Sequence, residues 1–481
     1  MKVCLGLLLV FYSGWFFGQC KPFVLRIFTD PVSDKICSSA LLEDVRELYS
    51  NIQQAHPDLY RNVSKETLDS SYLCLVNQCS KDLTLLTFVG ELNSFLQSLK
   101  DSHTFVSVKD LLSYRSVSRH YLPLRLMAQN GQVVVVKALE NKIPSGVRLL
   151  SINDIRASTY LQEAPLFAPV ESLADSAFQL TIPHVTSALI NLNHPNKLNS
   201  ITWLDGNDTV TSIVRNPRIS KTQQGEIFKG EPIEISFERK EGAGILKIAS
   251  FSPRNIKGFK KKLDQIFKEV TEKPVNKLII DLRNNTGGYI VLQEYLMSFL
   301  VPKNTVYSAD YVYKRSPYDR FSQLSKLERK RFVRVAKRFY PNGAISREYD
   351  FYNKPYGSLD TVKNSPVLKN KQELAYWGPC DVLVNELSMS ASANFTAWFM
   401  DRARGEVIGA PASGTNGGTF ANPYTFYLTN TGLPVSVSTM KINLLPIGQK
   451  EVPLVPNHRI IPTIEELKQE VDGVLNFALK H

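Results

Sequence analysis

After its first residues the chain lacks any apolar run long enough to span a bilayer, so the sequence predicts no later transmembrane helix. It also lacks internal repeats and low-complexity tracts, which excludes repeat architectures. The formal net charge of +12 is spread along the chain and is densest in Lys314–Arg338. No aromatic stacking motif or recognition helix accompanies this charge, so we expect a solvated basic face and no nucleic-acid partner.

Cysteine is scarce, with six residues in 481. No histidine lies near the cysteines, so the sequence predicts no metal site, and we expect no cofactor. In an oxidising compartment Cys74 and Cys79 could close a loop, or Cys37 could form a bridge. Buried free thiols are the open alternative.

The N-terminus carries the pattern of a secretory signal. Lys2 precedes an apolar run, and small and polar residues then close the segment 1–19. A buried N-terminal helix is the alternative. Cys20 follows directly, so a lipidated start is possible, although Gln19 is unusual before a lipidated cysteine. We therefore expect an exported protein, which is periplasmic, envelope-associated or extracellular.

The rest of the chain is long and apolar enough for two or three domains. Apolar residues recur at helical spacing in 37–110, which predicts an N-terminal helical domain. Residues 120–220 are rich in strand-like segments. From residue 232 to 481 strands alternate with amphipathic helices, which predicts an α/β fold with a largely parallel sheet and ligands at the carboxyl ends of its strands.

Two later segments add detail to this α/β region. Residues 302–366 interrupt the alternation with charged, helical sequence, notably Leu324–Phe339, and we expect an insertion beside the active cleft. A solvent-facing helix pair is the alternative. Thr463 and Glu466 form a capping-box pattern, which predicts a last helix that continues to about Leu479.

Residues Asn385–Phe395 combine an apolar strand end, small hydroxyl residues and the start of a helical pattern. Several hydrolases expose a nucleophilic serine on such a turn, where backbone N–H groups at the helix start can receive an anion. A serine-rich helix cap is the simpler alternative, because serine is a favoured N-cap residue.

A serine nucleophile also needs a base and a pocket for the oxyanion. Among the seven histidines, His103 stands between Ser102 and Thr104, where helical sequence gives way to strand sequence. Two glycines, Gly287 and Gly288, follow a buried strand and could direct backbone N–H groups into a cleft. A structural histidine and an ordinary glycine turn are the alternatives.

Three segments together resemble serine peptidase family S41, the family of C-terminal processing and tricorn-like proteases. Leu99–Val106 is similar to the family's L-x-D-x-H-T motif, and Leu278–Gly288 to its D-L-R-x-N-x-G-G motif. Val382–Asn416 resembles the nucleophile helix and the strand after it. The resemblance covers residues 45–110 and 240–460, and it implies a crotonase/ClpP-like β-β-α protease core.

The family has two catalytic styles. Its Ser–Lys members carry a lysine in a turn shortly after the nucleophile, but the corresponding turn 413–418 has none, and Lys441 is expected at the surface. The tricorn-like style has adjacent Ser and His residues near the start of the protease region, and Ser102 with His103 fits that pattern.

The resemblance therefore implies specific roles. Ser390 would be the nucleophile, His103 the general base, Ser102 an orienting group and Glu451 the relay carboxylate. The oxyanion-hole donors implied are the N–H groups of Ala391 and of Gly287 or Gly288. Asp401 is either a supporting acid or a helix-surface residue. Ser388 and Ser392 are the fallback nucleophiles.

Residues 122–160 resemble the PDZ-like segment of many family members, although an Asp and a Gly of its G-D-x-I-L-x-I-N-G turn are missing. A plain β subdomain is the alternative. We therefore expect a serine endopeptidase that cleaves a peptide or protein substrate through an acyl-enzyme. A peptide- or hydrophobic-ligand-binding protein without catalysis on the same fold is the alternative function.

Overall fold

The structure is a computed structural model. It describes residues 30–108, 111, 122, 124–129, 131–138, 143–169, 178–194, 198–215, 235–302, 309–318, 325, 327–328, 330–331, 334, 354–364, 372–444 and 451–481. The predicted signal segment 1–19 and Cys20 lie outside the described residues.

A six-stranded sheet forms the core of the C-terminal half, as the alternation of strands and helices predicts. Its strand order is β10-β11-β12-β15-β16-β21, and β10 alone is antiparallel to its neighbour. The strands are β10 Ile235–Lys240, β11 Ala243–Ile248, β12 Lys277–Asp281, β15 Cys380–Val384, β16 Val407–Gly409 and β21 His458–Arg459. The predicted α/β core with a largely parallel sheet is confirmed.

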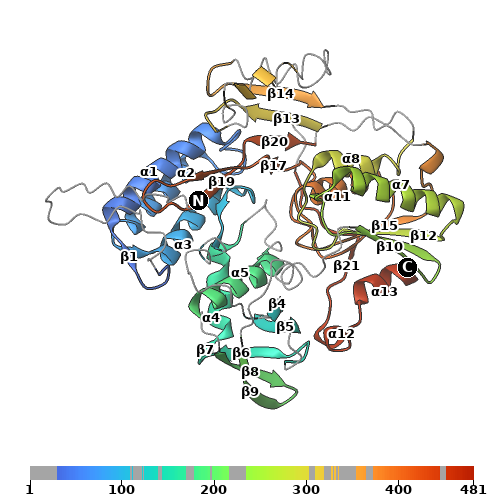
Figure 1. Cartoon of the computed structure of the whole chain (residues 1–481), viewed down its shortest axis with the longest axis horizontal. Coiled ribbons are helices and arrows are strands. Elements are labelled where there is room, and N and C mark those ends of the chain that lie inside the picture. Colours follow the sequence, from blue (N-terminus) through green and yellow to red (C-terminus); the bar gives the residue numbers. More distant parts are fainter. Residues whose placement is uncertain are drawn as a thin grey trace, which may run out of the picture.

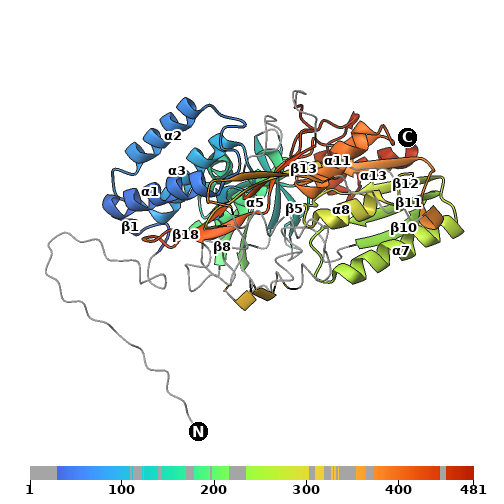
Figure 2. The ribbon, with the colours of Figure 1, turned by 90° about the horizontal axis from the view of Figure 1, so that it is seen from above.

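Both faces of this sheet are covered, because successive strand residues point to opposite faces. Leu278 and Ile280 pack with helices α7, α8 and α11 on one face, whereas Ile279 and Leu383 pack with α13 on the other. The helices are α7 Ile256–Glu272, α8 Ile290–Met297, α11 Ala391–Asp401 and α13 Gly473–Lys480. They gather on one side of the molecule in both views (Figure 1, Figure 2).

Three helices of the N-terminal part lie on the opposite side of the molecule (Figure 1). They are α1 Ser38–Ala55, α2 Lys65–Gln78 and α3 Leu85–Leu96, followed by a 3₁₀ turn at Gln97–Leu99. The short strand β3, Phe105–Val106, follows these helices and is the edge strand of a three-stranded sheet of order β18-β19-β3. Its other strands are β18 Tyr424–Tyr427 and β19 Pro434–Val437.

A β-rich subdomain lies between these two sides and below them in Figure 1. Its sheet has the order β4-β5-β6-β8-β9, with β7 paired to β6. The strands are β4 Leu124–Gln129, β5 Gln132–Ala138, β6 Arg148–Ile152, β7 Ile155–Arg156, β8 Leu198–Asp205 and β9 Asp208–Arg215. Two helices, α4 Ala157–Glu163 and α5 Phe178–Asn193, stand between its strands in sequence. Its PDZ-like character stays a prediction.

The molecule has two large hydrophobic cores. The first joins the N-terminal helices, the β-rich subdomain and strands β18 and β19, and it includes Leu99 and Val106. The second fills the face of the six-stranded sheet under α7, α8 and α11, and it includes Val384 and Ala391. His103 and Ser390 therefore stand on segments that belong to different cores.

Three sequence-based expectations need correction or completion. The interval 302–366 contains two antiparallel strands, β13 Ala309–Lys314 and β14 Leu359–Asn364, which join β20 Met440–Asn443 and β17 Phe420–Ala421 in a four-stranded sheet. Most of Leu324–Phe339 lies outside the described residues, and those described at 327–328, 330–331 and 334 are helical, as expected. The capping box at Thr463 is confirmed, but it starts the short helix α12, Ile464–Lys468, and the chain breaks before α13.

Of the alternatives that the sequence left open for the cysteines, the loop between Cys74 and Cys79 does not form. Both thiols are free, as is that of Cys380, whereas Cys37 is disulfide-bonded. Cys74 is exposed on α2, while Cys79 caps the same helix and is buried, so their side chains point apart. No helix in the described parts of the chain is both long and apolar enough to cross a membrane.

Candidate active site

Ser390 stands on a tight turn between a buried strand and a helix. We call residues 385–390 the serine turn; it leaves β15 and ends at the N-cap of α11, which is Ser390 itself. Ser390 has φ 52° and ψ −119°, a conformation that L-residues other than glycine rarely adopt. Such strained backbone costs about 1–3 kcal/mol and concentrates at functional sites. A strained strand-to-helix turn is also how hydrolases present a serine.

The fallback serines are less accessible than Ser390. Ser388 is fully buried, donates its hydroxyl to the Leu282 carbonyl at 2.8 Å, and accepts the Asn385 N–H at 3.0 Å. Ser392 is also fully buried, and no hydrogen-bond partner for its hydroxyl is found among the described residues. Ser390 is half-buried, so it is the serine of this group that a substrate can reach.

The glycine pair lies against the serine turn. A Cβ built on Gly287 would stand 2.7 Å from Ser390 Cβ and 2.9 Å from the Ala391 nitrogen. The Gly287 N–H donates to Asn285 Oδ1 at 2.9 Å. Within the described structure no acceptor is found for the N–H groups of Gly288 and Ala391. These two N–H groups are the donors best placed to receive an anion beside Ser390.

His103 lies in a second turn, residues 101–104, which we call the histidine turn. Its side chain is 19% exposed, and its Nδ1 stands 3.4 Å from Ser102 Oγ and 3.7 Å from Asp101 Oδ1. The turn joins the three-stranded sheet, because β3 pairs with β19 and Thr104 Oγ1 accepts the Ser438 N–H at 3.0 Å. A Ser–His contact is thus present next to a buried carboxylate.

Asp101 and His56 form a buried pair that the sequence analysis did not assign. His56 Nε2 lies 3.2 Å from Asp101 Oδ2, and both side chains are almost fully buried. His56 follows the C-terminus of α1, far from the histidine turn in sequence. Asp101 was visible in the L-x-D-x-H-T motif, but nothing in the sequence connected it to His56.

Glu451 is held by partners other than a histidine. Its carboxylate accepts Arg61 Nε at 3.1 Å, a close contact from Arg61 Nη2, and Thr415 Oγ1 at 3.0 Å. Asp401 is exposed at the end of α11 and lies 3.7 Å from Arg402, as a helix-surface residue would. Lys441, which was expected at the surface, is largely buried and pairs with Asp58 at 2.6 Å. The role of Glu451 as a relay carboxylate stays a prediction.

Residues 413–420, which we call the linking segment, run from the serine turn toward the histidine turn. At one end Ser413 forms a parallel bridge with Met389 and donates its hydroxyl to the Glu386 carbonyl at 2.8 Å. At the other end the Phe420 ring lies 4.5 Å from the His56 ring. The linking segment thus contacts the serine turn at one end and His56 of the buried pair at the other.

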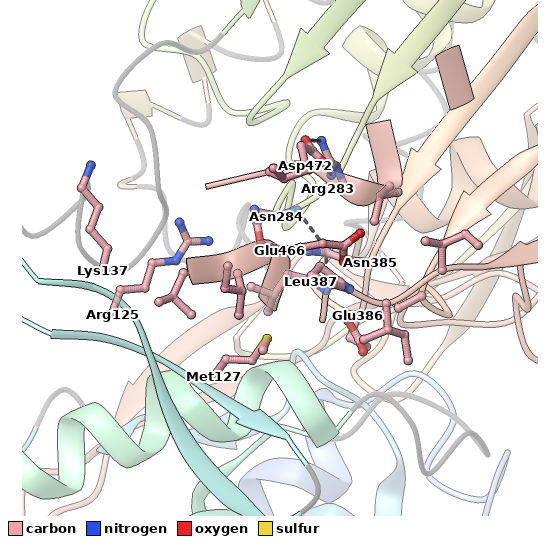
Figure 3. A pocket seen from close by; sticks show the side chains of 18 of the residues that line it. Arg125, Met127, Lys137, Arg283, Asn284, Asn385, Glu386, Leu387, Glu466 and Asp472 are labelled. Carbon is pink, nitrogen blue, oxygen red and sulfur yellow. Dashed lines mark hydrogen bonds and ion pairs between the residues drawn. The ribbon is translucent and has the colours of Figure 1, made fainter. Parts of the chain in front are cut away.

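A cleft of about 770 Å³ opens at the carboxyl ends of β12 and β15. Arg125, Met127 and Lys137 of the β-rich subdomain form one wall, and Glu386 and Leu387 of the serine turn lie across from them (Figure 3). Ligands of parallel α/β sheets bind at this edge. The serine turn therefore forms part of a cleft wide enough for several side chains.

Glu386 is an unusual carboxyl group in this cleft. Burial raises its pKa to about 7, against a smaller lowering by its own backbone N–H and by Arg459. The residue is only 5% exposed. The carboxyl group is therefore partly protonated at neutral pH.

The sequence comparisons point to one family. Residues 242–450 match the profile of peptidase family S41. The match includes Gly287, Gly288 and Ser390, whereas the histidine turn and Glu451 lie outside it. No curated protein sequence matches the chain.

Solved structures share the fold over nearly the whole chain. A mutant of CPAF superposes with a TM-score of 0.65 at 13% identity, covering 92% of this chain and 96% of that one. Mature CPAF superposes with a TM-score of 0.61 at 14% identity, covering 92% and 96%. Mature CPAF complexed with lactacystin gives 0.61 at 14% identity, covering 92% and 97%. At such identities these likenesses show the fold alone. What links this chain to a family is the match of residues 242–450 to peptidase family S41.

Proposed function

We propose that the protein is a serine endopeptidase whose nucleophile is Ser390 and whose general base is His103. The observation that carries the proposal is the strained, half-buried Ser390 at a strand-to-helix turn, with Gly287 packed against it. A protein that only binds ligands needs no strained serine beside unpaired backbone N–H groups. The match of residues 242–450 to peptidase family S41 supports a peptidase function at the coarser level.

The chemistry follows from these groups. His103 takes the proton of Ser390 Oγ as this oxygen attacks a peptide carbonyl carbon. The oxyanion that forms accepts hydrogen bonds from the N–H groups of Ala391 and Gly288. Each such donor lowers the barrier by about 3 kcal/mol. His103 then protonates the leaving amine, and a water molecule hydrolyses the acyl-enzyme to regenerate Ser390.

A fluorophosphonate probe tests this proposal directly, because it modifies an activated serine without knowledge of the substrate. We expect one probe per molecule, on Ser390, and no modification in Ser390→Ala or His103→Ala. Unmodified wild-type protein would favour the alternative, a ligand-binding protein on the same fold. A His103→Ala protein with full reactivity would refute the assignment of the base.

The substrate proposed is a peptide or protein segment that enters the cleft beside the serine turn. The mixed wall of Arg125, Met127 and Lys137 offers both apolar surface and positive charge to such a chain. Docking of a peptide end on the β-rich subdomain, as in PDZ modules, belongs to the same proposal. Cleavage-site profiling with a peptide library would identify the residues accepted.

Export is a separate proposal, supported by Lys2 and the apolar run in residues 1–19. The mature chain would begin near Cys20, with or without a lipid on its thiol. Mass spectrometry of the mature N-terminus after expression with the full sequence tests both points. An unprocessed Met1 would refute export by this signal.

A further inference from the structure

Asp101 is a buried carboxylate to which the proposed mechanism assigns no role. Its Oδ1 accepts the His103 N–H at 2.9 Å and lies 3.7 Å from His103 Nδ1. Its Oδ2 accepts Thr104 Oγ1 at 2.5 Å and faces His56 Nε2 at 3.2 Å. One side chain thus fixes the histidine turn through three neighbours.

The hydrogen bonds of His56 define its tautomer. The Asp58 N–H donates to His56 Nδ1 at 3.2 Å, so Nδ1 carries the lone pair. Nε2 therefore carries the hydrogen and donates it to Asp101. His56 thus orients the carboxylate as a hydrogen-bond donor.

Asp101 remains ionised inside the protein. Burial alone would raise its pKa, but hydrogen bonds from His103 and His56 outweigh burial and hold the pKa well below the usual range. Two cations near His56 are engaged by other groups: Lys441 binds Asp58, and Lys314 donates to the backbone carbonyls of Gln53 and His56. The imidazolium of His103 is a cation that this carboxylate can stabilise.

We propose that Asp101 is a positioning residue for the general base, and that His56 holds it in place from the end of α1. Asp101 orients the His103 ring and stabilises its protonated form when the ring takes the proton of Ser390. The inference rests on the proposed function and goes beyond it, because the buried pair links the N-terminal helices to catalysis.

The first test compares two buried aspartates. Asp101→Asn removes the carboxylate next to His103. Asp44→Asn is the matched control, because Asp44 is equally buried and accepts the Asn430 N–H, the Thr431 N–H and the Thr431 hydroxyl. We expect the rate constant for fluorophosphonate modification of Ser390 to fall about a hundredfold or more in Asp101→Asn, since the charge that supports the base is lost. In Asp44→Asn it should stay within about twofold of wild type.

A titration separates positioning from mere structural support. A nearby carboxylate raises the pKa of an imidazole, so Asp101→Asn should lower the pKa of His103 by about one unit. The midpoint of the pH–modification profile should move to lower pH by the same amount. An NMR titration of the His103 ring measures the pKa without any need for activity. A merely structural Asp101 would leave both midpoints unchanged.

His56 provides a second route if Asp101→Asn does not fold. His56→Gln retains an N–H donor, whereas His56→Leu does not, so we expect a smaller loss of rate in the glutamine variant. His194→Leu is the matched control, because His194 is buried in the β-rich subdomain with Tyr160 at 2.6 Å and Asn153 at 3.0 Å. We expect His194→Leu to leave the rate per folded molecule unchanged.

The outcomes are distinct. If wild-type protein is modified at Ser390 and Asp101→Asn matches it in rate and in His103 pKa, the positioning role is wrong and the proposed function stands. Equal losses in the two His56 variants and in His194→Leu would also overturn it. If wild-type protein is not modified at all, the proposed function itself fails.

Discussion

Gly287 and Ser390 are in such close contact that the space between them cannot hold one further carbon atom. A Cβ on Gly287 would stand 2.7 Å from Ser390 Cβ, below the distance that carbon atoms tolerate. Gly287 also has φ +94°, a region that glycine adopts at no steric cost. Because Gly287 has no side chain, its backbone can pack directly against the strained Ser390.

Gly287→Ala should displace the serine turn. We expect the rate of fluorophosphonate modification to fall at least about a hundredfold, with a loss of about 1–3 kcal/mol in the free energy of unfolding. Gly357→Ala is the control, because Gly357 has φ +89° and nothing within 4 Å of its built Cβ. Gly357→Ala should lower the free energy of unfolding only by the cost of its positive φ, and its rate of fluorophosphonate modification should equal that of the wild type. Equal rates in the two variants would contradict the contact argument.

Ser388 and Ser390 should respond oppositely to alanine substitution. Ser388→Ala leaves the Asn385 N–H without its acceptor and removes one of two donors to the Leu282 carbonyl, which should lower the free energy of unfolding by about 1–3 kcal/mol. Modification of Ser390 per folded molecule should persist. Ser390→Ala should abolish modification and change the free energy of unfolding little. Urea denaturation and mass spectrometry of the modified protein check both outcomes.

Glu386 should make stability decrease as pH rises. The ordinary carboxyl pKa is 4.5 and the folded value is about 7, so between these values the folded protein keeps a proton that the unfolded chain releases. The free energy of unfolding should therefore fall by about 3 kcal/mol from pH 4.5 to above pH 7. Glu386→Gln should remove this decline in urea denaturation at pH 5 and pH 8. The exposed Glu238→Gln should retain it, and an unchanged decline in Glu386→Gln would contradict the assignment.

Arg61 and Glu451 connect the N-terminal helices to the protease core. A double-mutant cycle with Arg61→Gln and Glu451→Gln should give a coupling free energy of about 1 kcal/mol, because the pair is partly buried and charged. The coupling should weaken in high salt. If Glu451 also acts as a relay carboxylate, Glu451→Gln should slow modification of Ser390 more than Arg61→Gln does. A coupling energy near zero would show that the pair is not a stabilising contact.

The free thiols should differ sharply in reactivity. Burial raises the pKa of Cys79 and of Cys380 to about 12 in each case, so neither forms a thiolate near neutral pH. Cys74 is exposed. Native protein treated with iodoacetamide should carry the label on the Cys74 peptide, and the other two peptides should react after unfolding. Early labelling of Cys380 would indicate that the core opens readily.

The serine turn could be predicted because its signals are local. A buried strand, small hydroxyl residues and a helical pattern are contiguous in sequence, and the structure has β15 and α11 at these positions. The buried pair of Asp101 and His56 could not be predicted in this way. Its members are far apart in sequence, and tertiary packing alone brings the end of α1 to the histidine turn.

Local signals also misled in two places. In the interval 302–366 the described residues of Leu324–Phe339 are helical as expected, but strands β13 and β14 at its two ends were missed, because β13 pairs with β14 and with β20 in long-range contacts that no local pattern reveals. Cys74 and Cys79 are near in sequence, yet the helix between them directs one thiol to solvent and the other to the core. In both cases long-range packing, and not the neighbouring sequence, determined the structure.

The division between two hydrophobic cores has a consequence for how the protein would lose activity on warming. The segment with His103 packs in the first core and the segment with Ser390 in the second, so the proposed hydrolysis would require the two cores to stay aligned. A small shift at the boundary between them would then abolish the proposed activity while each core remained folded. On warming, turnover would be lost before calorimetry registered any melting.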